Sequence, residues 1–292
     1  MTDFADPVAS PNPEAFKTKV REQWDRSAQG WDGHTVPIRA WLRQATDAML
    51  DMAGVGPGAL VLDVAAGAGD QTLDIARRVG SKGRVLATDL SPAMLALAQK
   101  NARQAGLNVQ TLVADGEELP LEPASFDAVV CRLGLMFFPS PVQGLRSMHR
   151  ALRPGGGICA MVFARPERNP CIGILMSTAL KHAGLPARDP FEPGGLLSLG
   201  KPGLVDTLFR AAGFQNVATT ALDAPFRLPT AHHYIDFVRS SASPIHQILG
   251  RLEPGPADAA WAEMEQRLGI FTTDDGWVGP NQLLLTAAQR SA

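Results

Sequence analysis

The sequence of 292 residues has almost no excess charge and few cysteines. Its 27 Lys and Arg residues and 29 Asp and Glu residues leave a formal net charge of −2. A near-neutral surface lacks the basic excess that nucleic-acid binding needs, so we expect no nucleic-acid partner. Cys131, Cys159 and Cys171 are the three cysteines, and they lack the C-x-x-C spacing of zinc or redox sites. Buried, reduced thiols are the simpler interpretation of Cys131 and Cys159, which fall in strand-like runs.

Long apolar runs and targeting segments are also missing. No window approaches the roughly 20 apolar residues that a membrane span needs, and the N-terminus has no charged region followed by an apolar core. No group of His, Asp and Glu has a recognisable metal-ligand spacing, so we predict no metal. Hydrophobic residues nevertheless make up 45% of the chain, which is typical of a globular protein with a core. We therefore expect a cytoplasmic protein without a membrane span.

Apolar strands and helical stretches alternate between residues 59 and 163. The expected strands are 59–64, 84–88, 109–113, 127–133 and 157–163, and the expected helices are 72–79, 92–105 and 141–152. Near-continuous apolar strands in such an alternation predict a parallel sheet covered on both faces. The helix 92–105 has well-defined ends, because Ser91 suits the N-cap, Pro92 the first helical position and Gly106 the C′ position.

Less regular segments flank this alternation. Before it, apolar residues at helical spacing run from residue 14 to residue 52, with a break at 30–37. After it, residues 164–200 are rich in proline and predict a loop with one helix near 172–182. The remaining expected elements are helices at 201–212, 231–241 and 258–268 and strands at 217–222 and 282–287.

A glycine turn follows the first expected strand. Residues 61–70 read VLDVAAGAGD, with Gly67 and Gly69 just before a helix. Glycines in this place allow a tight turn and let a ligand lie on bare backbone beside a helix N-terminus. A nicotinamide dinucleotide site would have a third glycine at position 72. The threonine found there argues against a turn that binds the pyrophosphate of such a ligand. A nicotinamide oxidoreductase nevertheless stays open as an alternative.

Charged residues stand at the ends of four expected strands. Asp63 can act on a cationic ligand through hydrogen bonds or water. Asp89 ends the second strand and can accept hydrogen bonds from both hydroxyls of a ribose. Asp115 follows the third strand, where an adenine amino group would lie, and Arg132 follows the fourth. Since ligands bind at the carboxyl edge of an open parallel sheet, these residues predict one site.

Each of these residues also has a purely structural interpretation. The glycines could only shape the turn, Asp89 could only end a strand or cap a helix, and Asp115 could be part of a simple turn. Arg132 could equally form a surface ion pair. Trp24 and Trp31 are typical of core or lid anchors.

Five segments, in order and spacing, resemble the motifs of class I S-adenosylmethionine-dependent methyltransferases. They are Val61–Asp70, Asp89–Leu95, Ala114–Pro120, Phe126–Val130 and Leu152–Gly156. The order is similar to the branch that includes the quinone-ring C-methyltransferases of ubiquinone and menaquinone biosynthesis, and W-x-x-x-A-x-x-W-D over residues 24–32 resembles the start of that branch. The resemblance covers about residues 20–165, with the final strand similar in kind.

The resemblance implies a fold, a cofactor and contacts. The fold would be α/β, a Rossmann-like, seven-stranded, mostly parallel, doubly wound sheet, with residues 282–287 as its antiparallel last strand. N-terminal helices and C-terminal helical insertions would form a lid. The cofactor would be S-adenosyl-L-methionine. Its methionine part would lie on Asp63, Ala65, Gly67, Gly69 and Arg132, its ribose and adenine on Asp89 and Leu90, and its adenine edge on Asp115 and Gly116.

We accordingly divide the chain into four parts. Residues 1–13 are a mobile tail, 14–56 an N-terminal helical lid and 57–165 the cofactor-binding α/β core. Residues 166–292 complete the sheet and carry helical insertions that cover the substrate.

The expected reaction is direct, in-line transfer of a methyl group to a small, partly hydrophobic or aromatic acceptor, of the quinone-precursor, phenol or amine type. We expect the acceptor pocket between the N-terminal helices and segments 164–200 and 223–280. Its candidate residues are Trp31, Trp41, Met136, Phe137, Phe138, Phe226, Tyr234 and Phe237.

No catalytic residue can be assigned from the sequence, because methyl transfer needs a base only if the acceptor must lose a proton. His34, His232 and His233 are weak candidates for that base, since each also reads as a surface or helix-end histidine. A non-catalytic cofactor-binding module is a further alternative. The choice of O-, N- or C-methylation stays open, as does the oligomeric state, with a homodimer among the states allowed.

Overall fold

The computed structural model describes residues 12–241 and 244–292, so most of the expected tail, residues 1–11, lies outside the described residues. A seven-stranded sheet with the order β3-β2-β1-β4-β5-β10-β6 forms the centre of the molecule. Its strands are β1 (Leu60–Val64), β2 (Arg84–Asp89), β3 (Gln110–Val113), β4 (Phe126–Arg132), β5 (Leu152–Phe163), β6 (Gln215–Asp223) and β10 (Gln282–Gln289).

The direction of the strands confirms the expected α/β fold class. Strands β1 to β5 pair in parallel, whereas β10 runs antiparallel to both of its neighbours, β5 and β6. The antiparallel strand was expected at 282–287, and it lies between β5 and β6 rather than at the edge of the sheet. The carboxyl ends of β1, β2, β3 and β4 therefore share one edge of the sheet, where their polar residues can meet.

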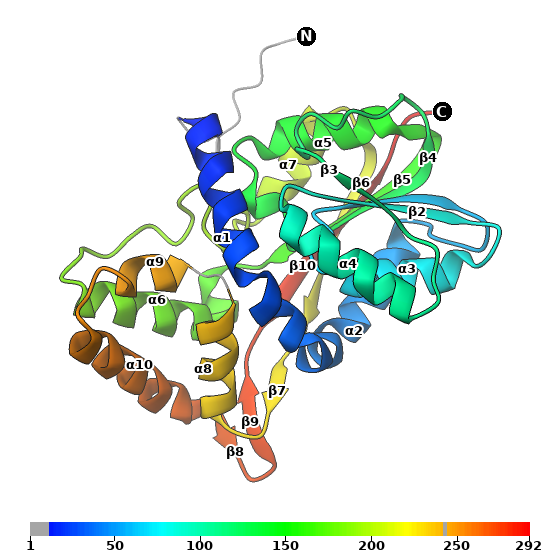
Figure 1. Ribbon diagram of the computed structural model, residues 1–292. Coiled ribbons are helices and arrows are strands. Elements are labelled where there is room, and N and C mark those ends of the chain that lie inside the picture. Colours follow the sequence, from blue (N-terminus) through cyan, green and yellow to red (C-terminus); the bar gives the residue numbers. More distant parts are fainter. Residues whose placement is uncertain (1–11, 242–243) are drawn as a thin grey trace.

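Helices cover both faces of this sheet (Figure 1). One layer consists of α2 (Thr35–Met52), α3 (Asp70–Val79) and α4 (Pro92–Gln104), and the other of α5 (Pro141–Ala151) and α7 (Leu204–Ala211). Strand residues such as Val61, Leu62 and Val129 are fully buried between the layers. This two-sided burial explains why the central strands β1, β4 and β5 are mostly apolar rather than alternating.

The ends of α4 follow its sequence. The hydroxyl of Ser91 accepts a hydrogen bond from the backbone N–H of Met94 at 3.1 Å, and Pro92 is the first helical residue. Gly106 has a positive φ of 66°, which ends the helix at little steric cost. The predicted N-cap, first position and C′ position are thus confirmed, and α4 is fixed beside the glycine turn after β1.

Helix α1 (Pro13–Gly33) joins this core to a C-terminal part. It contacts α4 on one side and α8 (Ala231–Ser240) on the other, and Figure 1 shows it in blue across the front of the molecule. The other C-terminal elements are α6 (Pro170–His182), α9 (Pro244–Leu249), α10 (Pro254–Leu268) and a three-stranded sheet of β7 (Phe226–Leu228), β9 (Gly276–Gly279) and β8 (Thr272–Thr273).

Two features differ from the sequence-based expectation. The break expected at residues 30–37 is confined to His34, because Pro37 lies in the first turn of α2, where its missing N–H removes no helical hydrogen bond. The three-stranded sheet and α9 were not expected, since strands of two to four residues are too short to show a periodicity.

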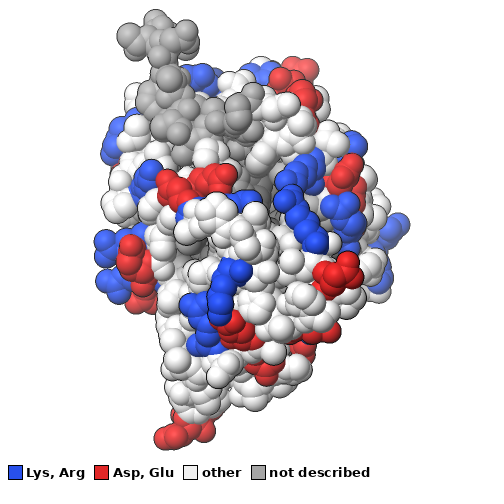
Figure 2. Space-filling view, turned by 90° about the vertical axis from the view of Figure 1, so that its left-hand side faces the viewer, with Lys and Arg blue, Asp and Glu red and all other residues white. Residues whose placement is uncertain are grey.

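The surface and the helix lengths give two further observations. On the face that Figure 2 shows, Lys and Arg side chains lie interspersed with Asp and Glu. Within residues 12–241 and 244–292, no helix combines the length and the apolar character that a bilayer crossing needs.

Candidate active site

A cavity of about 110 Å³ lies at the carboxyl ends of β1, β2 and β4, and we call it the strand-end cavity. Seven of the nine residues expected to hold a cofactor line it. They are Ala65, Gly67, Asp89, Leu90, Asp115, Gly116 and Arg132. Asp63 and Gly69 are not among the lining residues. Lys17, Trp24, Gln71, Thr88 and Met94 line it as well and were not anticipated.

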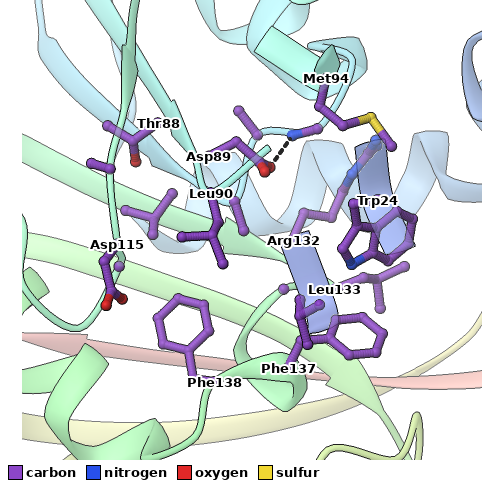
Figure 3. A pocket seen from close by; sticks show the side chains of 18 of the residues that line it. Trp24, Thr88, Asp89, Leu90, Met94, Asp115, Arg132, Leu133, Phe137 and Phe138 are labelled. Carbon is purple, nitrogen blue, oxygen red and sulfur yellow. Dashed lines mark hydrogen bonds between the residues drawn. The ribbon is translucent and has the colours of Figure 1, made fainter. Parts of the chain in front are cut away.

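Asp89 is held in place by the backbone on both sides. Its Oδ2 accepts a hydrogen bond from the N–H of Gly67 at 2.9 Å, drawn in Figure 3, and its Oδ1 accepts one from the N–H of Ser91 at 2.8 Å. Burial raises the pKa of Asp89, and these N–H donors oppose the rise. Each carboxylate oxygen keeps a lone pair for a further donor, which is what two ribose hydroxyls would require.

Gly67 leaves room beside this carboxylate. Its φ of 58° is in the left-handed region, which turns its N–H toward Asp89. A Cβ atom at Gly67 would have no atom within 4 Å, so the turn borders open space. The backbone cradle and the oriented carboxylate together fit a nucleoside ligand.

Asp115 is paired with a lysine from α1. The Lys17 Nζ lies 2.6 Å from Asp115 Oδ2 and 2.8 Å from Glu117 Oε2. Burial lowers the pKa of Lys17, but the two carboxylates outweigh it and raise that pKa above its ordinary value. Lys17 therefore stays charged and ties α1 to the loop after β3, which covers this end of the cavity. The sequence alone does not single out Lys17, because it is one of several charged residues in α1.

Asp63 lies behind the wall of the strand-end cavity. Its two carboxylate oxygens accept hydrogen bonds from Gln71 Nε2 at 3.1 Å and from Thr72 Oγ1 at 2.5 Å. Burial raises the pKa of Asp63 to about 6, against these hydrogen bonds. Thr72 thus uses its hydroxyl where a dinucleotide motif would have glycine. Gln71 lines the cavity, so its hydrogen bond to Asp63 fixes one side chain of the cavity wall.

Gly69 serves close packing in this structure. Its φ is 85°, and a Cβ atom there would lie 2.8 Å from the Cβ of Ala98 on α4. That separation is shorter than real Cβ contacts allow, so glycine lets α4 approach the turn.

Arg132, at the end of β4, forms a buried ion pair rather than a surface one. Only 7% of the residue is exposed, and its Nη2 donates to Asp70 Oδ2 at 2.8 Å. Its Nη1 donates to Thr46 Oγ1 at 2.9 Å. Arg132 also lines the strand-end cavity, so the ion pair fixes its side chain beside that cavity.

A second cavity, of about 120 Å³, adjoins the first, and we call it the aromatic cavity. Four residues line both cavities, namely Trp24, Trp31, Leu133 and Phe137. Figure 3 shows Trp24, Leu133 and Phe137 together on one side of the strand-end cavity, with Asp115 and Phe138 on the other. Further rings of the aromatic cavity come from segments far apart in the chain: Trp41, Phe163, Phe226, Tyr234, Phe237 and Trp277.

Two of the eight residues expected in the acceptor pocket lie elsewhere. Met136 is only 1% exposed, because the 3₁₀ turn Leu135–Phe137 directs it into the core. Phe138 lines the strand-end cavity, where its ring fills the space beside Gly116 and Gly144. The other six line the aromatic cavity: Trp31, Trp41, Phe137, Phe226, Tyr234 and Phe237.

The described residues that line the aromatic cavity include no carboxylate and no imidazole. Its titratable groups are Cys171, whose pKa burial raises to about 12, and Tyr234, whose pKa burial also raises. Both are therefore neutral near pH 7.

The three candidate bases lie outside both cavities. His34 Nδ1 is 2.8 Å from the backbone oxygen of Gly30, while His232 and His233 lie on the surface at the start of α8. Within the described ranges, no three His, Cys, Asp or Glu side chains gather as a metal site would require.

Comparison with known proteins relates the part of the chain around the strand-end cavity to methyltransferases. Residues 61–156 match the family of methyltransferase domains. The ubiquinone/menaquinone biosynthesis C-methyltransferase of Idiomarina loihiensis is 38% identical over 130 residues, which are 44% of this chain and 50% of that protein. Residues 61–156, about a third of the chain, therefore resemble a methyltransferase domain. The matched stretch spans about half the length of this relative.

Solved structures share the fold of this methyltransferase domain at low sequence identity. The [4+2]-cyclase SpnF has a TM-score of 0.59 and 18% identity, with 99% of each chain covered. Phosphoethanolamine N-methyltransferase 2 of Haemonchus contortus, in complex with S-adenosyl-L-methionine, has a TM-score of 0.55 and 17% identity, covering 93% of this chain and 60% of that one. A fold that carries both a cyclase and a methyltransferase does not by itself fix the reaction.

Proposed function

We propose that this protein transfers the methyl group of S-adenosylmethionine to a small, partly hydrophobic or aromatic acceptor, such as a quinone precursor, a phenol or an amine. The wall shared by the two cavities supports this most directly. Four residues border both cavities, namely Trp24, Trp31, Leu133 and Phe137. A ligand in one cavity would therefore lie next to a ligand in the other. Direct transfer requires such a meeting of donor and acceptor.

The strand-end cavity would hold the cofactor. Asp89 would accept hydrogen bonds from the ribose hydroxyls, and Leu90 would pack on the adenine, whose edge would lie at Asp115 and Gly116. Ala65, Gly67 and Arg132 would border the methionine part. When bound, the cofactor supplies an electrophilic methyl group on a cationic sulfur that leaves as a neutral thioether.

Asp63 and Gly69 would support this site from behind rather than touch the ligand. Asp63 would act through its hydrogen bond to Gln71, and Gly69 through the close approach of α4. Both roles are compatible with their places in the family motif.

The chain's own contribution to the reaction would be positioning. The rings of the aromatic cavity would hold the acceptor in line with the methyl group, and such orientation is worth up to about 7–11 kcal/mol in favourable intramolecular cases. Because Cys171 and Tyr234 are neutral near pH 7, the cavity offers no base. We therefore favour an acceptor that is nucleophilic without help, with any proton passing to water after the bond forms.

The acceptor would be a small molecule. Charges of both signs are interspersed on the face in Figure 2, unlike the basic groove that RNA or DNA would require. The C-methylation named for the relatives is one option, but Phe226, Tyr234, Phe237 and Trp277 lie outside the matched residues 61–156. Free thiols at Cys131, Cys159 and Cys171, all buried, support a reducing, cytoplasmic setting.

A transfer assay tests this function. We would incubate the protein with methyl-labelled S-adenosylmethionine and a panel of hydroquinones, phenols and amines, and follow label in the extracted product. We expect turnover on at least one aromatic acceptor and none on tRNA or a basic peptide. Turnover on tRNA alone would contradict the proposal, and cofactor binding without turnover on any acceptor would favour the non-catalytic alternative.

A further inference from the structure

Two asparagines meet at one corner of the aromatic cavity, whose lining side chains are mostly apolar. Asn281 lines the cavity, and Asn169, which is fully buried, lies behind it. The Asn169 Nδ2 donates to the backbone oxygens of Ala164 at 3.0 Å, Gln282 at 3.1 Å and Arg165 at 3.3 Å. Its Oδ1 accepts from the N–H of Gln282 at 3.1 Å and from Asn281 Nδ2 at 2.8 Å.

These contacts fix which way both amides point. If the Asn169 amide were reversed, its oxygen would face three carbonyl oxygens and its NH₂ would face the N–H of Gln282. The Oδ1 of Asn169 must therefore face Asn281, and Asn281 must present its NH₂ group in return. The carbonyl oxygen of Asn281 is the atom left over.

That oxygen has no partner within the described part of the chain. Asn281 Oδ1 is one of three buried side-chain atoms there without a hydrogen bond, and the other two, on Asp70 and His149, belong to residues that do not line the aromatic cavity. A buried acceptor without a donor is unfavourable, so a ligand that supplies the donor gains affinity.

Two indole N–H groups of the same cavity are already engaged. Trp41 Nε1 donates to the backbone oxygen of Ala224 at 2.7 Å, and Trp277 Nε1 donates to that of Leu268 at 2.8 Å. Neither indole can serve Asn281 or a ligand without breaking a hydrogen bond. Asn281 thus brings one oriented, buried carbonyl oxygen without a hydrogen bond to a cavity whose lining is mostly apolar rings.

We propose that Asn281 Oδ1 determines specificity in the aromatic cavity by accepting a hydrogen bond from a hydroxyl or N–H group of the acceptor. The ligand is then a flat aromatic molecule with a donor at its edge. An ether or a plain hydrocarbon of the same shape leaves the oxygen unpaired and binds more weakly. This inference rests on the proposed function, in which the aromatic cavity holds the acceptor.

A pair of matched probes tests the inference by binding alone. With S-adenosylhomocysteine present at saturation, titration calorimetry at pH 7 would compare 1-naphthol with 1-methoxynaphthalene, which share a ring system but differ in the O–H donor. We expect the wild-type protein to bind 1-naphthol about tenfold more tightly. Asn281→Leu should remove this preference. Ser241→Ala, a control at another polar residue of the same cavity, should retain it.

Equal affinities in the wild-type protein would overturn the inference, as would failure of both probes to bind or a preference that persists in Asn281→Leu. The melting temperature and S-adenosylhomocysteine affinity of the variant establish that it is folded, and Asn281→Ala replaces it if it is not. The calorimetry measures binding and no turnover, so it is independent of the transfer assay described above. A preference for 1-naphthol in calorimetry, together with no methyl transfer to any acceptor in that assay, would refute the proposed function and leave Asn281 as a ligand contact.

Discussion

Asp89 and Asp127 each accept a hydrogen bond from a backbone N–H, but at opposite edges of the sheet. Asp89 bonds to Gly67 in the glycine turn, and Asp127 bonds to Leu60 at the start of β1. We expect Asp89→Ala to weaken S-adenosylhomocysteine binding by about 1.5–3 kcal/mol, since it removes a charged acceptor from the ligand. Asp127→Ala should leave this affinity unchanged.

Calorimetry of both variants measures the difference, with NADH as a second ligand. Unchanged affinity in Asp89→Ala would mean that the ribose lies elsewhere. Tighter binding of NADH than of S-adenosylhomocysteine would contradict the cofactor assignment itself.

Asp63 makes stability depend on pH through its burial. Its pKa is about 6 in the folded protein, against an ordinary value of 3.8, so the folded state holds the proton more tightly than the unfolded state. Stability from this residue is therefore present below about pH 4 and is lost as the pH rises to about 6. Asp63→Asn, whose amide can still bond to Gln71 and Thr72, should reduce that loss by about 1–3 kcal/mol.

Urea unfolding at pH 4, 5, 6 and 7 measures the free energy of unfolding of the wild-type protein and of Asp63→Asn. Taking the difference between the two curves removes the contribution of the other carboxylates. Parallel curves would show that Asp63 titrates alike in the folded and unfolded states.

At the scale of elements, α1 and α8 approach each other at a glycine. A Cβ atom at Gly30 would lie 1.9 Å from the backbone oxygen of Ser240, whereas one at Gly33 would meet nothing within 4 Å. Gly30→Ala must move the helices apart, beside the contact between Trp31 and Phe237, whose ring centroids are 5.9 Å apart. We expect it to lower the free energy of unfolding by about 1–3 kcal/mol.

Gly33→Ala is the matched control on the same helix. It should be neutral or stabilise the protein by up to about 1 kcal/mol, because alanine favours the helical backbone. Urea unfolding of the two variants separates these effects. Equal changes in both would mean that the helices do not meet closely at Gly30.

The elements of the core were predictable because their signals are local. The strand 60–64 is apolar apart from Asp63, and the caps of α4 lie within a few residues of the ends of that helix. The short strands β7, β8 and β9 carry no such signal. They form because Trp277, which is 1% exposed, is buried against Phe271, six residues earlier, and against Tyr234 from the distant helix α8.

At the scale of the whole molecule, the two halves of the site differed in how far the sequence could predict them. The polar residues of the strand-end cavity follow parallel strands, so topology alone brings Asp89, Asp115 and Arg132 to one edge. The amide pair of the aromatic cavity joins residues 169 and 281, which are 112 positions apart. Neither asparagine stands in a motif, so only the folded chain reveals that one orients the other.

The aromatic cavity also makes the protein optically responsive. Four of the protein's five tryptophans line this cavity: Trp24, Trp31, Trp41 and Trp277. The fifth, Trp261, lies outside both cavities, under the guanidinium of Arg239. Indole emission depends on the polarity around the ring, so a molecule entering the cavity changes most of the intrinsic fluorescence while Trp261 supplies a steady background. Occupancy can therefore be followed without any added label.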